Sequence, residues 1–269
     1  MGRGRLTEIP PACSVDRVPE ALKASGISKR FGATRALEHL DIIVAAGEVH
    51  ALVGENGSGK STFIRILAGY HAPDPGGHLE VGGRPVRFPL RPGAPRQLGM
   101  SFVHQDLGLI PSLSVLENLR LGDLATRRGL RVDWRREVRE AEETLARYEL
   151  GFDPSTRVAD LDPRERALLA IVRAVEDLPT AGPKASPPGL LVLDEPSVFL
   201  PRVESERFGR LMRNVAASGA GVLFVSHDLD EVLRRADRVT VLRNGRARPT
   251  VPRDQAAAGD LAELMTGRR

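Results

Sequence analysis

The sequence predicts an α/β domain built on a mostly parallel sheet, with a smaller antiparallel part and an inserted group of helices. Short apolar runs bounded by glycine, at 190–193 and 222–225, have the composition of strands buried on both faces. Segments with helical spacing alternate with these runs, which is the order of parallel α/β folds. A chain of 269 residues, 41% of them hydrophobic, is long enough for one such domain with a sizeable insertion.

The first third of the chain is predicted to begin as a tail and to continue as strands and one helix. Residues 1–19 mix arginine, proline and acidic residues without periodicity, which indicates a flexible tail. Two β-rich runs at 40–44 and 49–53, separated by a glycine-containing turn, predict two strands joined by a tight turn. Helical spacing over 62–69 ends at a glycine and predicts a helix. Residues 71–99 are dense in proline and glycine, which favours irregular antiparallel structure.

The rest of the chain alternates between helix and strand. Helical spacing over 114–148, with many arginines and glutamates between the apolar positions, predicts an inserted helical part. A further helix is predicted at about 164–178. The proline-rich loop 179–189 has no chemistry that we can assign, and we interpret it as an exposed surface insertion. A helix at about 204–217 and a strand at 239–242 complete the alternation.

These elements predict one domain over 20–250, with a helical subdomain inserted at about 106–178 and a C-terminal segment at 251–269. The single cysteine, Cys13, excludes an internal disulfide framework and multi-cysteine zinc sites, which favours a reducing compartment. No stretch reaches the roughly 18 to 20 apolar residues of a membrane span. We therefore expect a cytoplasmic chain whose membrane contact is peripheral or made through a partner.

The charge pattern leaves two interpretations open. A net charge of +4 and a pI near 9.7 would suit a polyanionic partner, but the positive charge is scattered arginine with only four lysines. A compositional preference for arginine is favoured over a nucleic-acid surface. The aromatic share of 4% also gives little material for stacking bases.

Residues 54–61 match the phosphate-binding pattern G-x-x-x-x-G-K-[ST], and they stand between a predicted strand and a predicted helix. The glycines let successive backbone N–H groups turn toward a phosphate, and the helix adds the positive end of its dipole. Lys60 is expected to reach the β and γ phosphates and the Ser61 hydroxyl to bind Mg²⁺. The loop residues assigned to ATP binding are Gly54, Glu55, Asn56, Gly57, Ser58, Gly59, Lys60, Ser61 and Thr62.

Three further segments carry side chains suited to phosphate chemistry. Asp194 and Glu195 follow an apolar strand, where Asp194 would hold Mg²⁺ through water and Glu195 would polarise an attacking water. Such a pair alone is more often a helix cap or a solvated turn. His227 ends the strand at 222–225, at the edge where parallel sheets bind ligands, although a single histidine usually has no such role. Spacing alone says little about Gln105.

Together, these motifs occur in an order that resembles the nucleotide-binding subunit of an ATP-binding cassette (ABC) transporter, over about residues 21–248. The resemblance implies an α/β P-loop NTPase core of the ABC type, with ATP and Mg²⁺ as cofactors. It implies that Gln105 contacts Mg²⁺ and the membrane subunit, that His227 contacts the γ-phosphate, and that Phe31 stacks on adenine; an ordinary core role for Phe31 is the alternative. The implied catalytic residues are Glu195, His227 and Gln105, and the implied metal-binding residues are Ser61, Gln105 and Asp194.

Three stretches, at 103–106, 113–118 and 226–232, resemble the carbohydrate-import branch that serves ribose, xylose or galactose-like sugars. Members of that branch commonly carry two cassettes in one chain, and this sequence resembles the first. The implied partners are membrane permease subunits, a second cassette in a homodimer or heterodimer, and a solute-binding protein reached through the permease. The implied location is the cytoplasmic face of the plasma membrane, and no nucleic-acid partner is expected.

The sequence departs from the family where the signature Leu-Ser-Gly-Gly-Gln should stand. The corresponding residues are Leu161, Asp162, Pro163, Arg164 and Glu165. Asp162 replaces a neutral donor by an anion, which repels a γ-phosphate unless Arg164 or Arg166 compensates, and Pro163 lacks an N–H. Pro201 also stands where the family has an aspartate after the Asp-Glu pair.

These departures predict an asymmetric pair, in which a second cassette supplies an intact signature. Two alternatives remain: an ABC-type ATPase that acts on nucleic acid, or a regulatory subunit that binds ATP with little turnover.

Overall fold

The computed structural model describes residues 18–126, 132–179, 187–195 and 202–267. The predicted tail lies almost wholly outside the described residues, as does most of the loop 179–189. Pro201 is also outside them.

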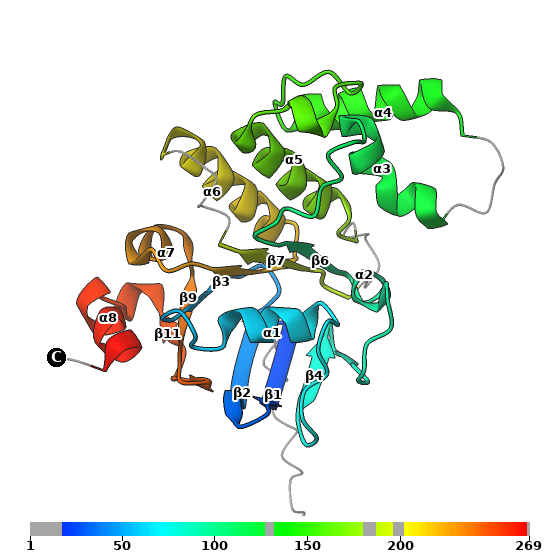
Figure 1. Ribbon diagram of the computed structural model, residues 1–269. Coiled ribbons are helices and arrows are strands. Elements are labelled where there is room, and N and C mark those ends of the chain that lie inside the picture. Colours follow the sequence, from blue (N-terminus) through cyan, green and yellow to red (C-terminus); the bar gives the residue numbers. More distant parts are fainter. Residues whose placement is uncertain (1–17, 127–131, 180–186, 196–201, 268–269) are drawn as a thin grey trace, which may run out of the picture.

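Two sheets form the body of the molecule (Figure 1). Within the described residues, the larger sheet has seven strands in the order β10-β9-β3-β8-β7-β6, with β11 paired to β9, and its strands from β9 to β6 all run parallel. The smaller sheet is antiparallel, in the order β2-β1-β4-β5. The strands are β1 (Glu20–Phe31), β2 (Thr34–Ala45), β3 (Val49–Val53), β4 (His78–Val81), β5 (Arg84–Pro85), β6 (Met100–Val103), β7 (Leu190–Asp194), β8 (Gly221–Val225), β9 (Arg238–Arg243), β10 (Arg246–Ala247) and β11 (Val251–Pro252).

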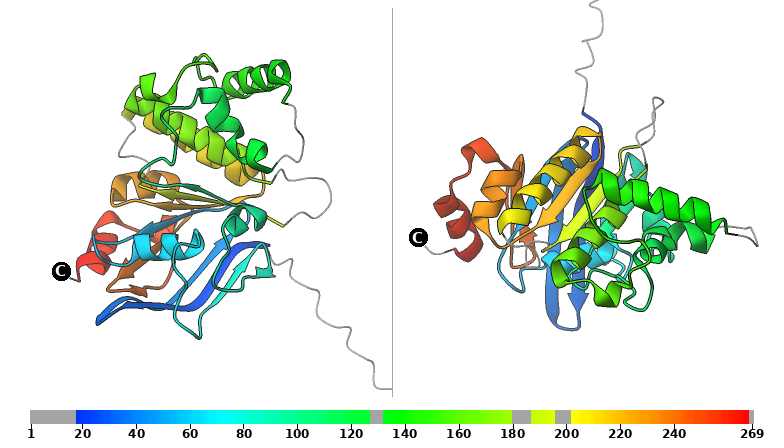
Figure 2. Two further views of the ribbon diagram at one scale, coloured as in Figure 1. Left: turned by 45° about the vertical axis from the view of Figure 1, so that its right-hand side comes forward. Right: turned by 90° about the horizontal axis from the view of Figure 1, so that it is seen from above.

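Helices cover both faces of the larger sheet. Helix α1 lies between the two sheets, α5 and α6 cover the opposite face, and α3 and α4 extend beyond α5 (Figures 1 and 2). The helices are α1 (Lys60–Leu67), α2 (Ala94–Gln97), α3 (Val115–Thr126), α4 (Trp134–Arg147), α5 (Pro163–Glu176), α6 (Arg202–Ala217), α7 (Leu229–Arg235) and α8 (Ala258–Thr266). In the part of the chain that the structure describes, none of them combines the length and apolar character needed to cross a membrane.

The parallel strands are buried on both faces, as their continuous apolar composition predicts. In β7, Leu191 and Leu193 pack into the core that contains α5 and α6, whereas Leu190 and Val192 pack into the core that contains α1. The side chains of β8 alternate in the same way. The sheet is therefore the central layer of the molecule, and its strand ends are held rigidly on both sides.

The sequence-based prediction of two strands joined by a tight turn is confirmed by β2 and β3, but the strands belong to different sheets. β2 pairs with β1, and β3 runs parallel to β8 and β9. The long strand β1 and the short strands β6, β10 and β11 were not predicted. β1 is interrupted by register shifts, one of them around Gly26, which blurs its alternation, and β6 has only four residues.

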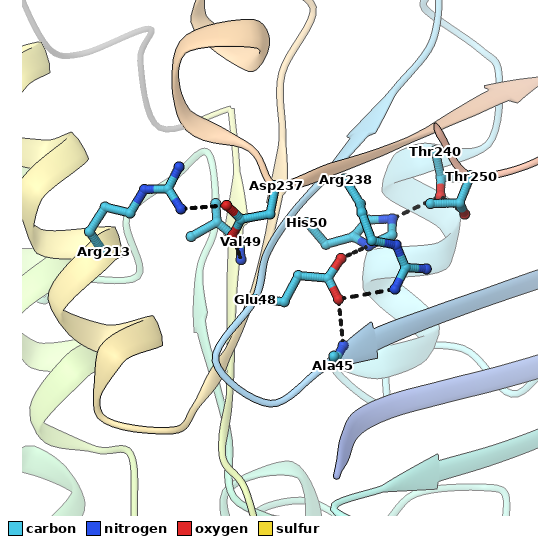
Figure 3. Close-up of polar contacts among 9 residues, drawn as sticks. All are labelled: Ala45, Glu48, Val49, His50, Arg213, Asp237, Arg238, Thr240 and Thr250. Carbon is cyan, nitrogen blue, oxygen red and sulfur yellow. Dashed lines mark hydrogen bonds and ion pairs between the residues drawn. The ribbon is translucent and has the colours of Figure 1, made fainter. Parts of the chain in front are cut away.

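A buried polar cluster joins the turn between β2 and β3 to β9 (Figure 3). Glu48 Oε1 lies 2.7 Å from His50 Nδ1, and Glu48 Oε2 accepts the N–H of Ala45 at 2.8 Å. The same oxygen lies 3.3 Å from Arg238 Nη1. His50 Nε2 lies 2.8 Å from Thr240 Oγ1, and His50 is fully buried. The cluster gives each of these buried groups a polar partner, which removes most of the cost of their burial.

We expect the substitution Glu48→Ala to lower the free energy of unfolding by about 3 kcal/mol, because it leaves a buried histidine and a backbone N–H without their acceptor. Urea denaturation followed by circular dichroism measures this loss. Glu38→Ala is the matched control, since Glu38 also contacts arginines but does so at the surface. Equal denaturation midpoints for the two variants would contradict the prediction.

Candidate functional site

The glycine-rich loop connects the end of β3 to the start of α1, as its sequence predicts. Gly59 is the residue before the helix and has a φ of 112°, which L side chains rarely adopt. A Cβ at this position would lie 2.4 Å from the carbonyl oxygen of Ala36. Gly57 also has a positive φ, of 81°. Glycine is therefore required here both for backbone conformation and for the close approach of the neighbouring strand β2.

The side chain of Lys60 folds back across this loop. Its ammonium donates to the carbonyl oxygens of Gly54 at 2.7 Å and Glu55 at 3.0 Å, and the residue is only 5% exposed. Burial lowers the pKa of Lys60, and the negative charges of Glu195 and Asp194 oppose this shift. The loop thus holds a partly desolvated ammonium close to two carboxylates, an arrangement suited to an anionic ligand that arrives with a cation.

The predicted acid pair and histidine lie at the carboxyl ends of neighbouring strands. Asp194 ends β7, and Glu195 follows it with a φ of 51°, held by its N–H donating to Val225 at the end of β8 at 3.0 Å. Glu195 Oε1 lies 3.6 Å from His227 Nδ1. Burial raises the pKa of Asp194, and the charge of Glu195 adds to this rise, while His104 and Lys60 oppose it.

The phosphate loop, Glu195 and His227 share one cavity of about 550 Å³, whereas Lys60 and Asp194 are not among its lining residues. Its lining residues are Gly54, Glu55, Asn56, Glu195, His227 and Met265. The structure therefore brings together four segments that are far apart in the sequence, and three of them carry predicted site residues. A larger hollow of about 1100 Å³ lies at the opposite edge of the strands, beside Gly189 and Ala220, and contains none of the predicted site residues.

Met265 is the one lining residue that sequence reasoning missed. It lies on α8, within the segment that the sequence interpretation left without a function, and it is mostly buried together with Leu261. The spacing of four between these two apolar residues was the available signal for an amphipathic helix. Nothing in that spacing, however, shows that α8 reaches the phosphate loop, which follows β3, the strand next to β9.

Gln105 and Phe31 are not among the residues that line the cavity. Gln105 is exposed in the turn after β6, at the same edge of the sheet as Asp194, because Val103 pairs with Leu193. Phe31 ends β1 and is 44% exposed, so the structure does not place it in the core. Its ring meets His71 edge-on, with centroids 5.1 Å apart.

The residues at the signature position, which differ from the family motif, form a capped N-terminus of α5. Asp162 is the N-cap of α5, and its Oδ1 accepts the N–H groups of Arg164 and Glu165, both at 2.8 Å. Glu165 Oε2 accepts the N–H of Asp162 at 2.8 Å, which completes a capping box. Pro163 supplies no N–H. The start of α5 thus satisfies its own backbone donors, and its Arg164 guanidinium lies 3.1 Å from Asp162 Oδ2.

The charge of Asp162 persists at neutral pH. Its pKa lies below the usual value, chiefly because the Glu165 N–H donates to the carboxylate, and Arg164 adds to the effect. In addition, Arg166 donates to the carbonyl oxygens of Leu161 at 2.9 Å and Ala159 at 2.8 Å. Arg164 therefore pairs with Asp162, whereas the guanidinium of Arg166 donates to backbone carbonyl oxygens.

The family described as ABC transporter matches residues 37–198. Among curated relatives, the chain is 42% identical to "Ribose import ATP-binding protein RbsA 2" of Rubrobacter xylanophilus, over 94% of this chain and 46% of the relative. It is 38% identical to "Putative ribose/galactose/methyl galactoside import ATP-binding protein 3" of Agrobacterium fabrum, over 92% of this chain and 47% of the relative. The chain thus spans about half the length of the curated relatives it matches.

Solved structures show the same fold. The ADP conformation of MJ1267, an ATP-binding cassette of an ABC transporter, aligns with a TM-score of 0.75 at 23% identity, over 93% of this chain and 99% of that chain. A dimeric post-hydrolysis state of the cassette MJ0796, bound to ADP and Pi, aligns with a TM-score of 0.72 at 23% identity, over 86% and 98% of the two chains.

Proposed function

Since this chain belongs to the ATP-binding cassette (ABC) transporter family, we propose that it binds and hydrolyses ATP and thereby energises a membrane transporter that imports a sugar. The observation that carries the proposal is the single cavity in which the phosphate loop, Glu195 and His227 meet. The names of the relatives, which specify import of ribose or galactose-like sugars, support the substrate class.

In this proposal, backbone N–H groups of the loop bind the phosphates of ATP, and Lys60 balances their charge. Glu195 accepts a proton from the attacking water, and His227 donates to the γ-phosphate. Phe31 stacks on the adenine ring. The 3.6 Å contact between Glu195 Oε1 and His227 Nδ1 supports this division of roles, because the two side chains lie side by side.

The donors near the cavity suit Mg²⁺. Ser61, Gln105 and Asp194 offer hydroxyl, amide and carboxylate oxygens, the hard ligands that this ion prefers. Within the described residues, no group of three or more His, Cys, Asp or Glu side chains could hold a metal ion. We therefore propose that the three oxygens hold Mg²⁺ only together with phosphate oxygens, where the ion neutralises developing negative charge.

A second cassette completes the machinery in our proposal. The self-capped start of α5 offers a γ-phosphate a carboxylate instead of N–H groups, so this chain is suited to hydrolyse ATP only opposite an intact signature. The Gln105 turn and the helices α3 to α5 contact permease subunits at the cytoplasmic face of the plasma membrane. A solute-binding protein delivers the sugar to that permease.

Saturable binding of Mg-ATP and slow hydrolysis are the results expected for the purified chain alone. Equilibrium dialysis and steady-state phosphate release, measured over a range of protein concentrations, test both. Absence of ATP binding would overturn the function itself. Hydrolysis that rises more than linearly with protein concentration would overturn the asymmetric pairing, because homodimers would then work.

The self-capped start of α5 also favours a second candidate, a regulatory subunit that binds ATP with little turnover. The contact between Glu195 and His227 opposes it, because a site without turnover needs neither side chain. Mixing the chain with an intact cassette distinguishes the two functions. Hydrolysis by this chain's own site, lost when only this chain carries Glu195→Gln, would exclude the regulatory role.

A further inference from the structure

A buried polar group adjoins His227 in the chain. Ser226 is 1% exposed, and on α7 Glu231 is 2% and Arg235 8% exposed. None of these three side chains has a part in the chemistry described above. Buried charged residues are costly to keep, and apolar residues of similar volume often replace such pairs without loss of stability. The presence of this group beside a site residue therefore calls for a role.

The hydroxyl of Ser226 links the His227 turn to α7. It accepts the N–H of Asp228 at 3.1 Å and donates to Glu231 Oε2 at 3.1 Å. Asp228 in turn caps α7, its Oδ1 accepting the N–H of Glu231 at 3.1 Å. Both neighbours of His227 in the sequence are therefore bound to Glu231. Ser226 contacts the Glu231 carboxylate, and Asp228 contacts the Glu231 backbone N–H.

Arg235 holds the carboxylate from the other side. Its Nε lies 3.3 Å from Glu231 Oε1, and its guanidinium lies over the ring of Phe208, 5.4 Å from the centroid. Gly209 makes room for it, because a Cβ there would lie 2.8 Å from Arg235 Nη1. The guanidinium is thus packed against α6 while it forms an ion pair with Glu231.

The same element is anchored to the strand that leads into the phosphate loop. The carbonyl oxygen of Arg235 accepts Arg213 Nη2 at 2.6 Å, and Arg213 Nη1 donates to Asp237 at 2.6 Å. Asp237 accepts the N–H of Val49, the first residue of β3, at 2.8 Å (Figure 3). Helix α7 is therefore held relative to both β3 and α6.

We infer that Glu231, fixed by Arg235 and acting through Ser226, is a positioning residue that orients His227 toward Glu195 and the γ-phosphate. The inference rests on the proposed function for the identity of the ligand. The orientation itself is a property of the nucleotide-free chain. Loss of the Ser226 hydroxyl removes the link between the His227 turn and Glu231 but keeps the ion pair between Glu231 and Arg235. Loss of the Glu231 charge removes that ion pair.

Nuclear magnetic resonance of the imidazole C–H groups tests this inference, because the chain has only six histidines. His227→Gln assigns the signal. In Ser226→Ala and Glu231→Gln we expect the His227 signal of the free protein to move or broaden, and its shift on adding the non-hydrolysable analogue AMP-PNP with Mg²⁺ to shrink. The affinity for the analogue should stay close to that of the parent chain, since the phosphate loop is unchanged.

Single-turnover ATP hydrolysis, measured with an intact second cassette present, gives the functional readout, and we expect it to fall about tenfold in both variants because a reacting group is misplaced. Glu137→Gln is the matched control, because Glu137 is also buried and lies 3.3 Å from Arg120 Nε, but in the helical part. It should lose comparable stability with an unchanged His227 signal. If Glu231→Gln fails to fold, Ser226→Ala decides alone, since it keeps the ion pair.

An unchanged His227 signal in Ser226→Ala would overturn the inference and leave the proposed function standing. Failure of the parent chain to bind AMP-PNP would instead overturn the proposed function. The His227 signal of the free protein would still show whether Ser226 and Glu231 orient His227. Equal effects of Ser226→Ala and Glu137→Gln on the His227 signal would mean that the buried cluster contributes only to the stability of the fold. That result would also overturn the inference.

Discussion

Glu195→Gln is expected to abolish ATP hydrolysis and to preserve ATP binding. The amide keeps the size and hydrogen-bonding shape of the side chain but cannot accept a proton from water, a loss worth roughly 10²- to 10⁴-fold in rate. ATP binding should not weaken, because the substitution removes a negative charge close to the phosphate loop, where it would repel the phosphates of ATP. The same charge is close enough to Asp194 to raise the pKa of that residue. Phosphate release, measured with an intact second cassette present, gives the rate, and equilibrium dialysis gives the affinity.

Glu55→Gln is the matched control for this experiment. Glu55 lines the same cavity, but it contacts Lys60 through its backbone carbonyl, which the substitution leaves in place. At saturating ATP its hydrolysis rate should therefore remain close to that of the parent chain, because the loop binds phosphate through backbone N–H groups. Equal rates in Glu195→Gln and Glu55→Gln would mean that Glu195 does not activate the attacking water.

The parts of this site that could be predicted from the sequence obey local rules. The phosphate loop is recognisable because glycine is required at set positions between a strand and a helix. Asp194, Glu195 and His227 could be placed at one sheet edge because parallel strands end together. The structure confirms that edge and brings Glu195 within 3.6 Å of His227. The chemistry assigned to these residues stays a prediction.

What could not be predicted depends on contacts between distant segments. The tight turn after β2 gave no sign that β2 and β3 belong to different sheets, because the pairing is decided by β1 and β8 elsewhere in the chain. Met265 reaches the cavity only through the packing of α8. The capping box at Asp162 and Glu165 was readable from their spacing of three residues. The sequence interpretation considered only the charge of Asp162 and the missing N–H of Pro163 there.

The signature can be tested by restoring its chemistry. The double substitution Asp162→Ser with Pro163→Gly keeps a good helix cap, removes the anion and returns an N–H at position 163. It also removes the carboxylate that lies 3.1 Å from Arg164. We expect the variant chain alone to hydrolyse ATP at least about tenfold faster than the parent, since a single lost donor to a developing charge costs an enzyme more than this.

The rate should also rise more than linearly with protein concentration, because the gain requires two copies to close on ATP. Asp133→Ser is the control, since Asp133 caps α4 by accepting the N–H of Arg136 at 3.2 Å in the same manner. It should leave hydrolysis unchanged.

Asp162→Asn separates the two causes of the defect, because it removes the charge and keeps both the cap and Pro163. A partial gain in this variant would assign the defect to electrostatic repulsion as well as to the missing donor. No gain in the double variant would mean that the closed start of α5 is not what prevents pairing. The departure at Pro201, where the family has an aspartate, would then be the next position to restore.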